Sequence, residues 1–299
     1  MEWLFDDPSY DGIGGEGDVD VGGDDRRKVQ RWALGVLYFY WNGEEWTNSD
    51  GWMEYGVDEC EWRGITCDDE EGDYGDGDDD NNNINNNRAA AAFRPVSEMN
   101  LPSNNLGGTT PRELSLLSSN FRKLILSSNS FVDFSPQFGK LDALRILDLG
   151  HNAITGSLPD RAFVKGRWSY LEELRLEGNR FEDTLPASLG LSLGELKILD
   201  LGGNRFGGAL PKEWGNLHTL VALTIDGNTG INGTVPAEFG DMISLKEFYL
   251  DGTSVSGSMP EEVCQLFRFG GILEGDCPVD TEEREWECSC CTNFCNSKR

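Results

Sequence analysis

Cysteines are the residues of this chain best suited to covalent or metal chemistry. The chain has eight of them: Cys60, Cys67, Cys264, Cys277, Cys288, Cys290, Cys291 and Cys295. None lies between positions 67 and 264, so an even number gathers at the two ends of the chain. This distribution predicts disulfides that staple both ends, although the six C-terminal cysteines allow 15 pairings. A zinc site in "CSCCTNFC" and free thiols are the alternatives; structural zinc usually takes paired CxxC units, which this segment lacks.

Groups that could carry catalysis are sparse. The two histidines, His151 and His218, lie in different parts of the sequence, and no GxSxG, HExxH, P-loop or kinase motif is present. The acidic stretch "DYGDGDDDN" at 73–81 does not match a calcium loop, because Asn81 and Asn87 stand where Gly and Glu are required. We therefore expect no enzymatic activity, no cofactor and no metal site.

Charge and hydropathy exclude further classes of function. The formal net charge is −28, and residues 1–87 hold 25 acids and 5 bases, so direct binding to nucleic acid is not expected. The longest apolar run, "WALGVLYFYW" at 32–41, is about half a membrane span. The first twenty residues have neither a basic n-region nor an apolar h-region and predict no signal peptide.

The middle of the chain is periodic. An Asn recurs after an "LxL" pattern at Asn104, Asn129, Asn152, Asn179, Asn204 and Asn228, with spacings of 23 to 27 residues, and Thr253 holds the corresponding place in a seventh unit. A period near 24 residues predicts an α/β leucine-rich repeat solenoid of about seven repeats, each with one short parallel strand. The Asn side chains are expected to hydrogen-bond backbone groups in the turns.

The second half of each unit is more specific. It reads "FGGALPKEWG", "INGTVPAEFG" or "ITGSLPDRAF", a GxΦP pattern in which Φ is apolar. Over residues 96–266 the chain therefore resembles the plant-type extracellular leucine-rich repeat proteins, such as receptor-like ectodomains and polygalacturonase-inhibitor-like proteins. The resemblance implies a second short strand in each repeat. The C-terminal Cys spacing is more similar to that of extracellular leucine-rich proteins of algae such as diatoms.

The N-terminal block strengthens the resemblance. Residues 26–67 hold five of the nine Trp and end in "CEWRGITC", which is similar to the N-terminal cap of these proteins and leads us to pair Cys60 with Cys67. We expect a disordered acidic tail at 1–25, the cap at 26–67, a low-complexity acidic and Asn-rich loop at 68–95, the repeats at 96–266 and a Cys-rich C-terminal cap at 267–299. Disulfides imply an extracellular or cell-surface protein whose leader or anchor is missing from this sequence. Asn232 is a candidate glycosylation site.

The concave face is the expected binding surface. Residues that alternate with the core Leu of each strand are expected to be exposed there. The candidates that could bind a cationic protein or peptide are Asp148, Glu173, Arg175, Glu177, Asp200, Asp226, Glu247, Tyr249 and Asp251. The family resemblance implies a non-catalytic recognition module for a protein, peptide or cell-wall glycan. A structural or adhesive cell-wall protein and an intracellular interaction scaffold are the alternatives.

Overall fold

The computed structural model describes residues 23–68, 93–117, 120–164, 166–275, 286–287 and 290. Most of the expected N-terminal tail, residues 69–92 of the expected loop at 68–95, and Cys277, Cys288, Cys291 and Cys295 lie outside the described residues.

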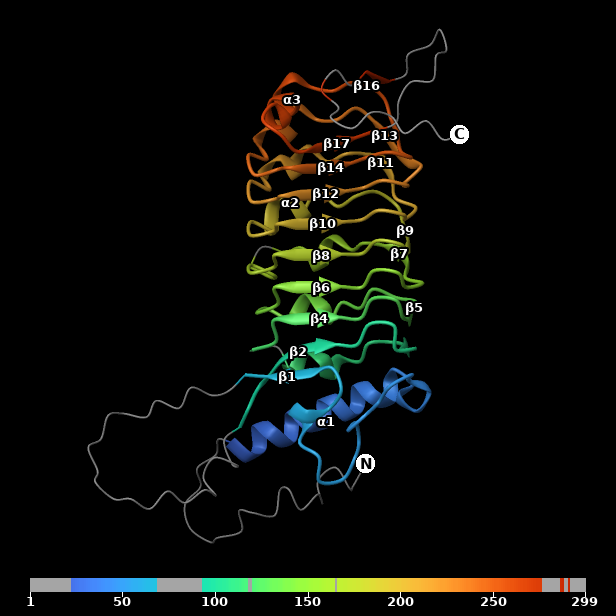
Figure 1. Ribbon diagram of the computed structural model, residues 1–299, viewed down its shortest axis with the longest axis vertical. Coiled ribbons are helices and arrows are strands. Elements are labelled where there is room, and N and C mark those ends of the chain that lie inside the picture. The colour runs from blue at the N-terminus through green and yellow to red at the C-terminus, as the bar shows by residue number, and fades with distance from the viewer. Residues whose placement is uncertain are drawn as a thin grey trace, which may run out of the picture.

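Seven short parallel strands form a ladder, one from each predicted repeat (Figure 1). They are β2 (Val96–Asn100), β4 (Lys123–Ile125), β6 (Ile146–Asp148), β8 (Glu173–Arg175), β10 (Ile198–Asp200), β12 (Ala222–Thr224) and β14 (Glu247–Tyr249). Their register has no slips, so that Ile146, Glu173 and Ile198 lie side by side. This arrangement confirms the predicted solenoid, because one turn of chain per strand is what a repeat near 24 residues produces.

The sheet continues beyond the repeats at both ends. At the N-terminal end, β1 (Ile65–Cys67) pairs with β2 in the antiparallel direction. At the other end, β17 (Ile272–Glu274) adds a parallel strand next to β14. The segment that we assigned to the C-terminal cap therefore begins by extending the sheet, and it contributes Glu274 to the same face as the repeat strands.

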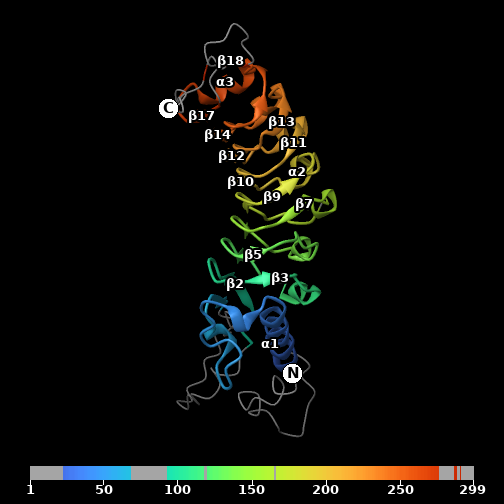
Figure 2. The ribbon, with the colours of Figure 1, turned by 90° about the vertical axis from the view of Figure 1, so that its right-hand side faces the viewer.

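A second set of short strands follows the first in each turn (Figure 2). They are β3 (Gly107–Gly108), β5 (Ser130–Phe131), β7 (Thr155–Ser157), β9 (Arg180–Glu182), β11 (Gly207–Ala209), β13 (Gly230–Gly233) and β15 (Ser254–Val255), and β16 (Gly257–Ser258) pairs with β18 (Trp286–Glu287). The backbone conformation explains why the GxΦP pattern contains Gly: Gly208 has a φ of 76°, which residues with a Cβ rarely adopt. The second strand implied by the family resemblance is present.

Short helices return the chain along the convex side. They are η5 (Arg112–Leu117), η6 (Phe138–Lys140), η7 (Asp160–Ala162), α2 (Leu189–Ser192), η8 (Lys212–Asn216), η9 (Ala237–Asp241) and α3 (Glu261–Phe267). The Pro of the GxΦP pattern immediately precedes most of them, for example Pro211 before η8, with a φ of −69°. Proline suits this position because its fixed φ matches the start of a helix and its missing N–H has no partner there.

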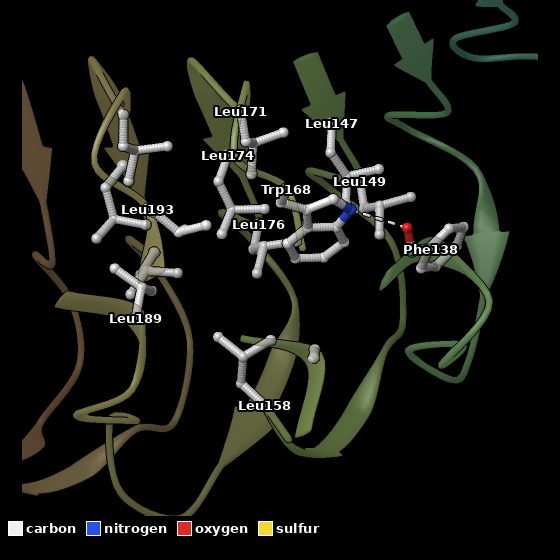
Figure 3. Close-up of a cluster of buried hydrophobic side chains, with 14 of the residues drawn as sticks. Phe138, Leu147, Leu149, Leu158, Trp168, Leu171, Leu174, Leu176, Leu189 and Leu193 are labelled. Carbon is white, nitrogen blue, oxygen red and sulfur yellow. Dashed lines mark hydrogen bonds between the residues drawn. The ribbon is translucent and has the colours of Figure 1, made fainter. Parts of the chain in front are cut away.

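Leucine side chains from successive turns fill the space between the strands and the convex helices. Leu147, Leu149, Leu174 and Leu176 are fully buried and form the layer shown in Figure 3. Trp168 lies in the same layer, and its indole N–H donates to the Phe138 carbonyl of the preceding turn at 2.8 Å. The core is therefore continuous from one repeat to the next, and each turn depends on its neighbours for burial.

The repeat asparagines join neighbouring turns, as the sequence predicted. The Asn204 amide nitrogen donates to the carbonyls of Leu176 and Leu201, and its oxygen accepts from the Phe181 N–H at 3.1 Å. In the seventh unit, the Thr253 hydroxyl donates only to Leu250 of its own turn among the bonds of the described residues. A hydroxyl is too short and has too few donors to replace the amide across turns.

The N-terminal block covers the open end of the first repeat. Helix α1 (Gly23–Tyr40) packs against η5, and η3 (Gly43–Glu45) and η4 (Glu59–Glu61) follow it. The helix starts three residues inside the segment that we expected to be a disordered tail. Cys60 and Cys67 form a disulfide that ties η4 to β1. At the opposite end of the solenoid, Cys264 on α3 is bonded to Cys290.

Candidate ligand-binding face

The nine candidate residues lie on one face of the repeat sheet, on strands β6 to β14 or within two residues of their ends. Within each strand the central residue is buried and its two neighbours point away from the core. We expected these outward side chains to be exposed, but all except Asp251 are half-buried. Parallel strands lie about 4.8 Å apart, so each outward side chain is covered in part by those of the adjacent strands.

Two carboxylates meet where β6 and β8 end. Asp148 accepts a hydrogen bond from the Gly150 N–H at 3.0 Å and another from the Ser127 hydroxyl. The Glu177 carboxylate occupies the space that a side chain at position 150 would need. Burial raises the pKa of Glu177 above its usual value, and the negative charges of Asp200 and Asp148 raise it further. A side chain at position 150 would displace this carboxylate from its present place.

The same arrangement returns two repeats later. Asp200 accepts from the Gly202 N–H at 3.1 Å, and the Asp226 carboxylate lies where a Cβ on Gly202 would stand. Burial raises the pKa of Asp200, although the hydrogen bond from Gly202 opposes the shift. Burial also raises the pKa of Asp226, and the charge of Asp251 adds to it. We call Asp148, Glu177, Asp200, Asp226, Asp251 and Glu274 the acidic row, since each lies at or just beyond the C-terminal end of its strand.

The other candidates lie beside the acidic row. Arg175 makes an ion pair with Glu173 of its own strand at 3.1 Å, which reduces the net charge of the centre of the face. Burial raises the pKa of the Tyr249 phenol, and the charges of Glu247 and Glu274 raise it further. Tyr249 therefore presents a neutral aromatic ring between two carboxylates, a position suited to contacts with a cationic or apolar group.

A row of cations at the N-terminal ends of the same strands was not among the predicted site residues. Arg122, Arg145, Lys197 and Lys246 each immediately precede a strand, and all four are exposed. We call these four residues the basic rim. The signal is present in the sequence as a base at the second position of units such as "LRILDL" and "LKILDL". The prediction of the binding surface considered only residues that alternate with the core Leu, so it did not include the residue that immediately precedes each strand.

Of the two histidines and the glycosylation candidate Asn232, only His151 lies next to this face. His218 lies on the convex side, where its Nδ1 is 2.9 Å from the Asp241 carbonyl oxygen, whereas His151 lies beside Glu177, with Nε2 3.8 Å from that carboxylate. Asn232 is exposed on β13. Within the described ranges, no three His, Cys, Asp or Glu side chains are placed to hold a metal ion together. No helix of the described part of the chain is long and apolar enough to cross a membrane.

Comparison with known proteins matches the repeats to plant proteins. The Leucine Rich Repeat family profile matches residues 143–161, 170–191 and 195–217. Receptor-like protein 35 of Arabidopsis thaliana is 37% identical over 107 residues, which cover 36% of this chain and 11% of that protein. The chain thus spans about a tenth of the length of that relative.

Solved structures agree in fold. The plant peptide hormone receptor RGFR1 in complex with RGF2 is 30% identical, with a TM-score of 0.52 over 58% of this chain and 26% of that one. The ectodomain of the Arabidopsis receptor kinase HAESA, in complex with an IDA peptide hormone ligand, has a TM-score of 0.57 at 21% identity, over 84% of this chain and 42% of that one. The latter comparison bears on the fold alone.

Proposed function

We propose that this chain is a non-catalytic recognition module of the plant leucine-rich repeat type, and that its concave face binds the basic side chains of a peptide. The observation that carries the proposal is the acidic row. Its six carboxylates come from six different turns of the chain, and three of them, Glu177, Asp200 and Asp226, have raised pKa values. Crowding of partly buried negative charge costs free energy, which a bound cation would recover.

The solved receptor RGFR1, which is 30% identical to this chain, supports a peptide as the ligand, because it is described as a complex of a plant peptide hormone receptor with RGF2. Extended peptides suit this face because stacked strands form a long, rigid and regular surface. Rigidity matters for affinity, because a surface that is already ordered loses little conformational entropy on binding.

We further propose that the protein acts at the cell surface or outside the cell. The disulfides Cys60–Cys67 and Cys264–Cys290 support this location, because such bonds persist in oxidising compartments. Alkylation of the native protein before and after reduction tests the point. Immediate alkylation of Cys60 or Cys264 would contradict it and favour the intracellular scaffold.

Isothermal titration calorimetry measures the binding of a synthetic ten-residue peptide in which lysine and glycine alternate. The variant Asp200→Asn with Asp226→Asn removes two charges from the acidic row without changing side-chain size. Its matched control is Glu195→Gln with Glu238→Gln, which removes the same charge from exposed positions away from the face. We expect the first variant to bind about tenfold more weakly and the control to bind like the parent.

Equal weakening in both variants would mean that the peptide senses only the net charge of −28, and the proposed site would be wrong. The absence of saturable binding to this peptide and to its alternating glutamate–glycine counterpart would favour a structural or adhesive protein instead.

A further inference from the structure

The two ends of the repeat strands carry opposite charges, and we call these two sides of the concave face its edges. The acidic row lies where the strands end, and the basic rim lies where they begin. The basic rim occupies four of six successive turns, with Glu172 before β8 and Val221 before β12 in the other two. The backbone at these positions is bonded from turn to turn: the Arg145 N–H donates to the Arg122 carbonyl at 2.7 Å, and the Lys197 N–H donates to the Glu172 carbonyl at 2.7 Å. The four cations therefore stand in register at the same position of their turns.

Acidic neighbours cancel only part of the charge of the basic rim. Glu172 accepts from both Arg145, at 2.9 Å, and Lys197, at 2.5 Å, and these two cations lower its pKa, Lys197 having the larger effect. Arg122 is paired with Asp68. Lys246 has no ion pair among the described residues. Four cations thus face two carboxylates, which leaves an excess of positive charge on a chain whose net charge is −28.

The separation of the two edges matches the geometry of an extended peptide. Arg145 and Asp148 are three residues apart along one strand, about 10 Å at 3.3 Å per residue. In an extended chain, successive side chains point to opposite sides. A peptide that crosses the strands along the face can therefore direct every second side chain to the acidic row and the others to the basic rim.

We propose that the ligand of this face is an extended peptide in which basic and acidic residues alternate, with its acidic side chains against the basic rim. This proposal rests on the proposed function, because the acidic row must take the basic side chains. A ligand of uniform charge would be attracted by one edge and repelled by the other. The two edges together therefore select for a charge pattern, and they also fix the rotation of the peptide about its own axis.

Two peptides of identical composition test the charge pattern. One has five lysines alternating with five glutamates, and the other has the five lysines in one block and the five glutamates in another. We expect the alternating peptide to bind about tenfold more tightly in calorimetry at moderate salt, a free-energy difference of about 1.4 kcal/mol. Equal affinity for the two peptides would overturn the proposal, because composition and net charge are the same.

Rim variants test the position of the acidic side chains. Lys197→Gln with Lys246→Gln should lower the affinity for the alternating lysine–glutamate peptide to that of the block peptide. The matched control, Lys140→Gln with Lys212→Gln, removes two exposed charges from the convex helices and should leave this affinity unchanged. If the rim variant binds like the parent, the proposal is wrong.

The lysine–glycine peptide separates this proposal from the proposed function. It carries no acidic residue, so the rim variant should bind it at least as well as the parent does. If that peptide depends on Asp200 and Asp226 but charge pattern has no effect, only the present proposal fails. If it does not depend on them, the proposed function fails as well.

Discussion

Replacement of Asn204 by alanine is the sharpest test of how the repeats hold together. The Asn204 side chain is 6% exposed, and its amide nitrogen lies 2.9 Å from the Leu176 oxygen, 3.0 Å from that of Leu201 and 3.2 Å from that of Gly202. Its oxygen accepts from the Phe181 N–H at 3.1 Å. Asn204→Ala removes all four bonds at once and brings no replacement donor or acceptor.

The losses differ in cost. The Leu176 and Leu201 carbonyls keep a second donor, from Asn179 and Asn228 respectively, so they remain satisfied. The buried Phe181 N–H has no other acceptor among the bonds of the described residues. An unsatisfied buried N–H costs about 1–3 kcal/mol, and the three weaker losses add about 1 kcal/mol together. We expect Asn204→Ala to lower the free energy of unfolding by about 2–4 kcal/mol.

Urea unfolding of the oxidised protein, followed by circular dichroism, measures this effect, with the slope of the transition compared between variants. Asn216→Ala is the matched control, because the Asn216 side chain is exposed and makes one bond, to the Glu213 carbonyl. We expect it to change stability by less than about 0.5 kcal/mol. Asn204→Thr should fall between the two, since a hydroxyl can keep the bond within its own turn, as Thr253 does. A loss for Asn204→Ala no larger than that of the control would refute the reasoning.

Two further changes probe the core and the acidic row. Trp168→Phe should cost about 1–3 kcal/mol in urea unfolding, because it removes the buried bond to Phe138 and leaves a small void; an unchanged midpoint would contradict this packing. Asp226→Asn should stabilise the protein at pH 7. The pKa of Asp226 is higher in the folded chain than in the unfolded chain, because burial raises it. The free energy of unfolding therefore falls as the pH rises from the pKa of this carboxyl in the unfolded chain to its pKa in the folded chain. Melting temperatures of parent and variant should therefore converge as the pH falls through that interval, and a constant difference would contradict the assignment.

The solenoid could be read from the sequence because its causes are local and repeated. A Leu that recurs twice within each strand predicts which side chains are buried. An Asn at the next turn predicts where the backbone is bonded between repeats, and a Gly three residues before a Pro predicts the second strand and the convex helix. Each unit repeats the same solution, so the period carries the information even where one unit departs from it, as at Thr253.

The candidate site could be predicted only in outline. Alternation placed Asp200 and Asp226 on the concave side, but it predicted neither their half-burial nor the approach of both carboxylates to Gly202. Both depend on the carboxylate of one repeat reaching over the glycine of another, and no pattern within a single repeat contains that distance. Glu274 was missed for a related reason, since its strand follows the last recognisable repeat.

The sequence by itself determined the repeat, the residues of the core and the gathering of cysteines at the two ends. Only the tertiary structure identified the Cys264–Cys290 bond, which is compatible with three of the 15 pairings, and only stacking in register turned scattered charges into an acidic row and a basic rim. The physical reason is the same in each case. Core burial depends on spacing along the chain, whereas disulfide pairing and electrostatic interaction depend on distances between turns that are about 24 residues apart in sequence and about 4.8 Å apart in space.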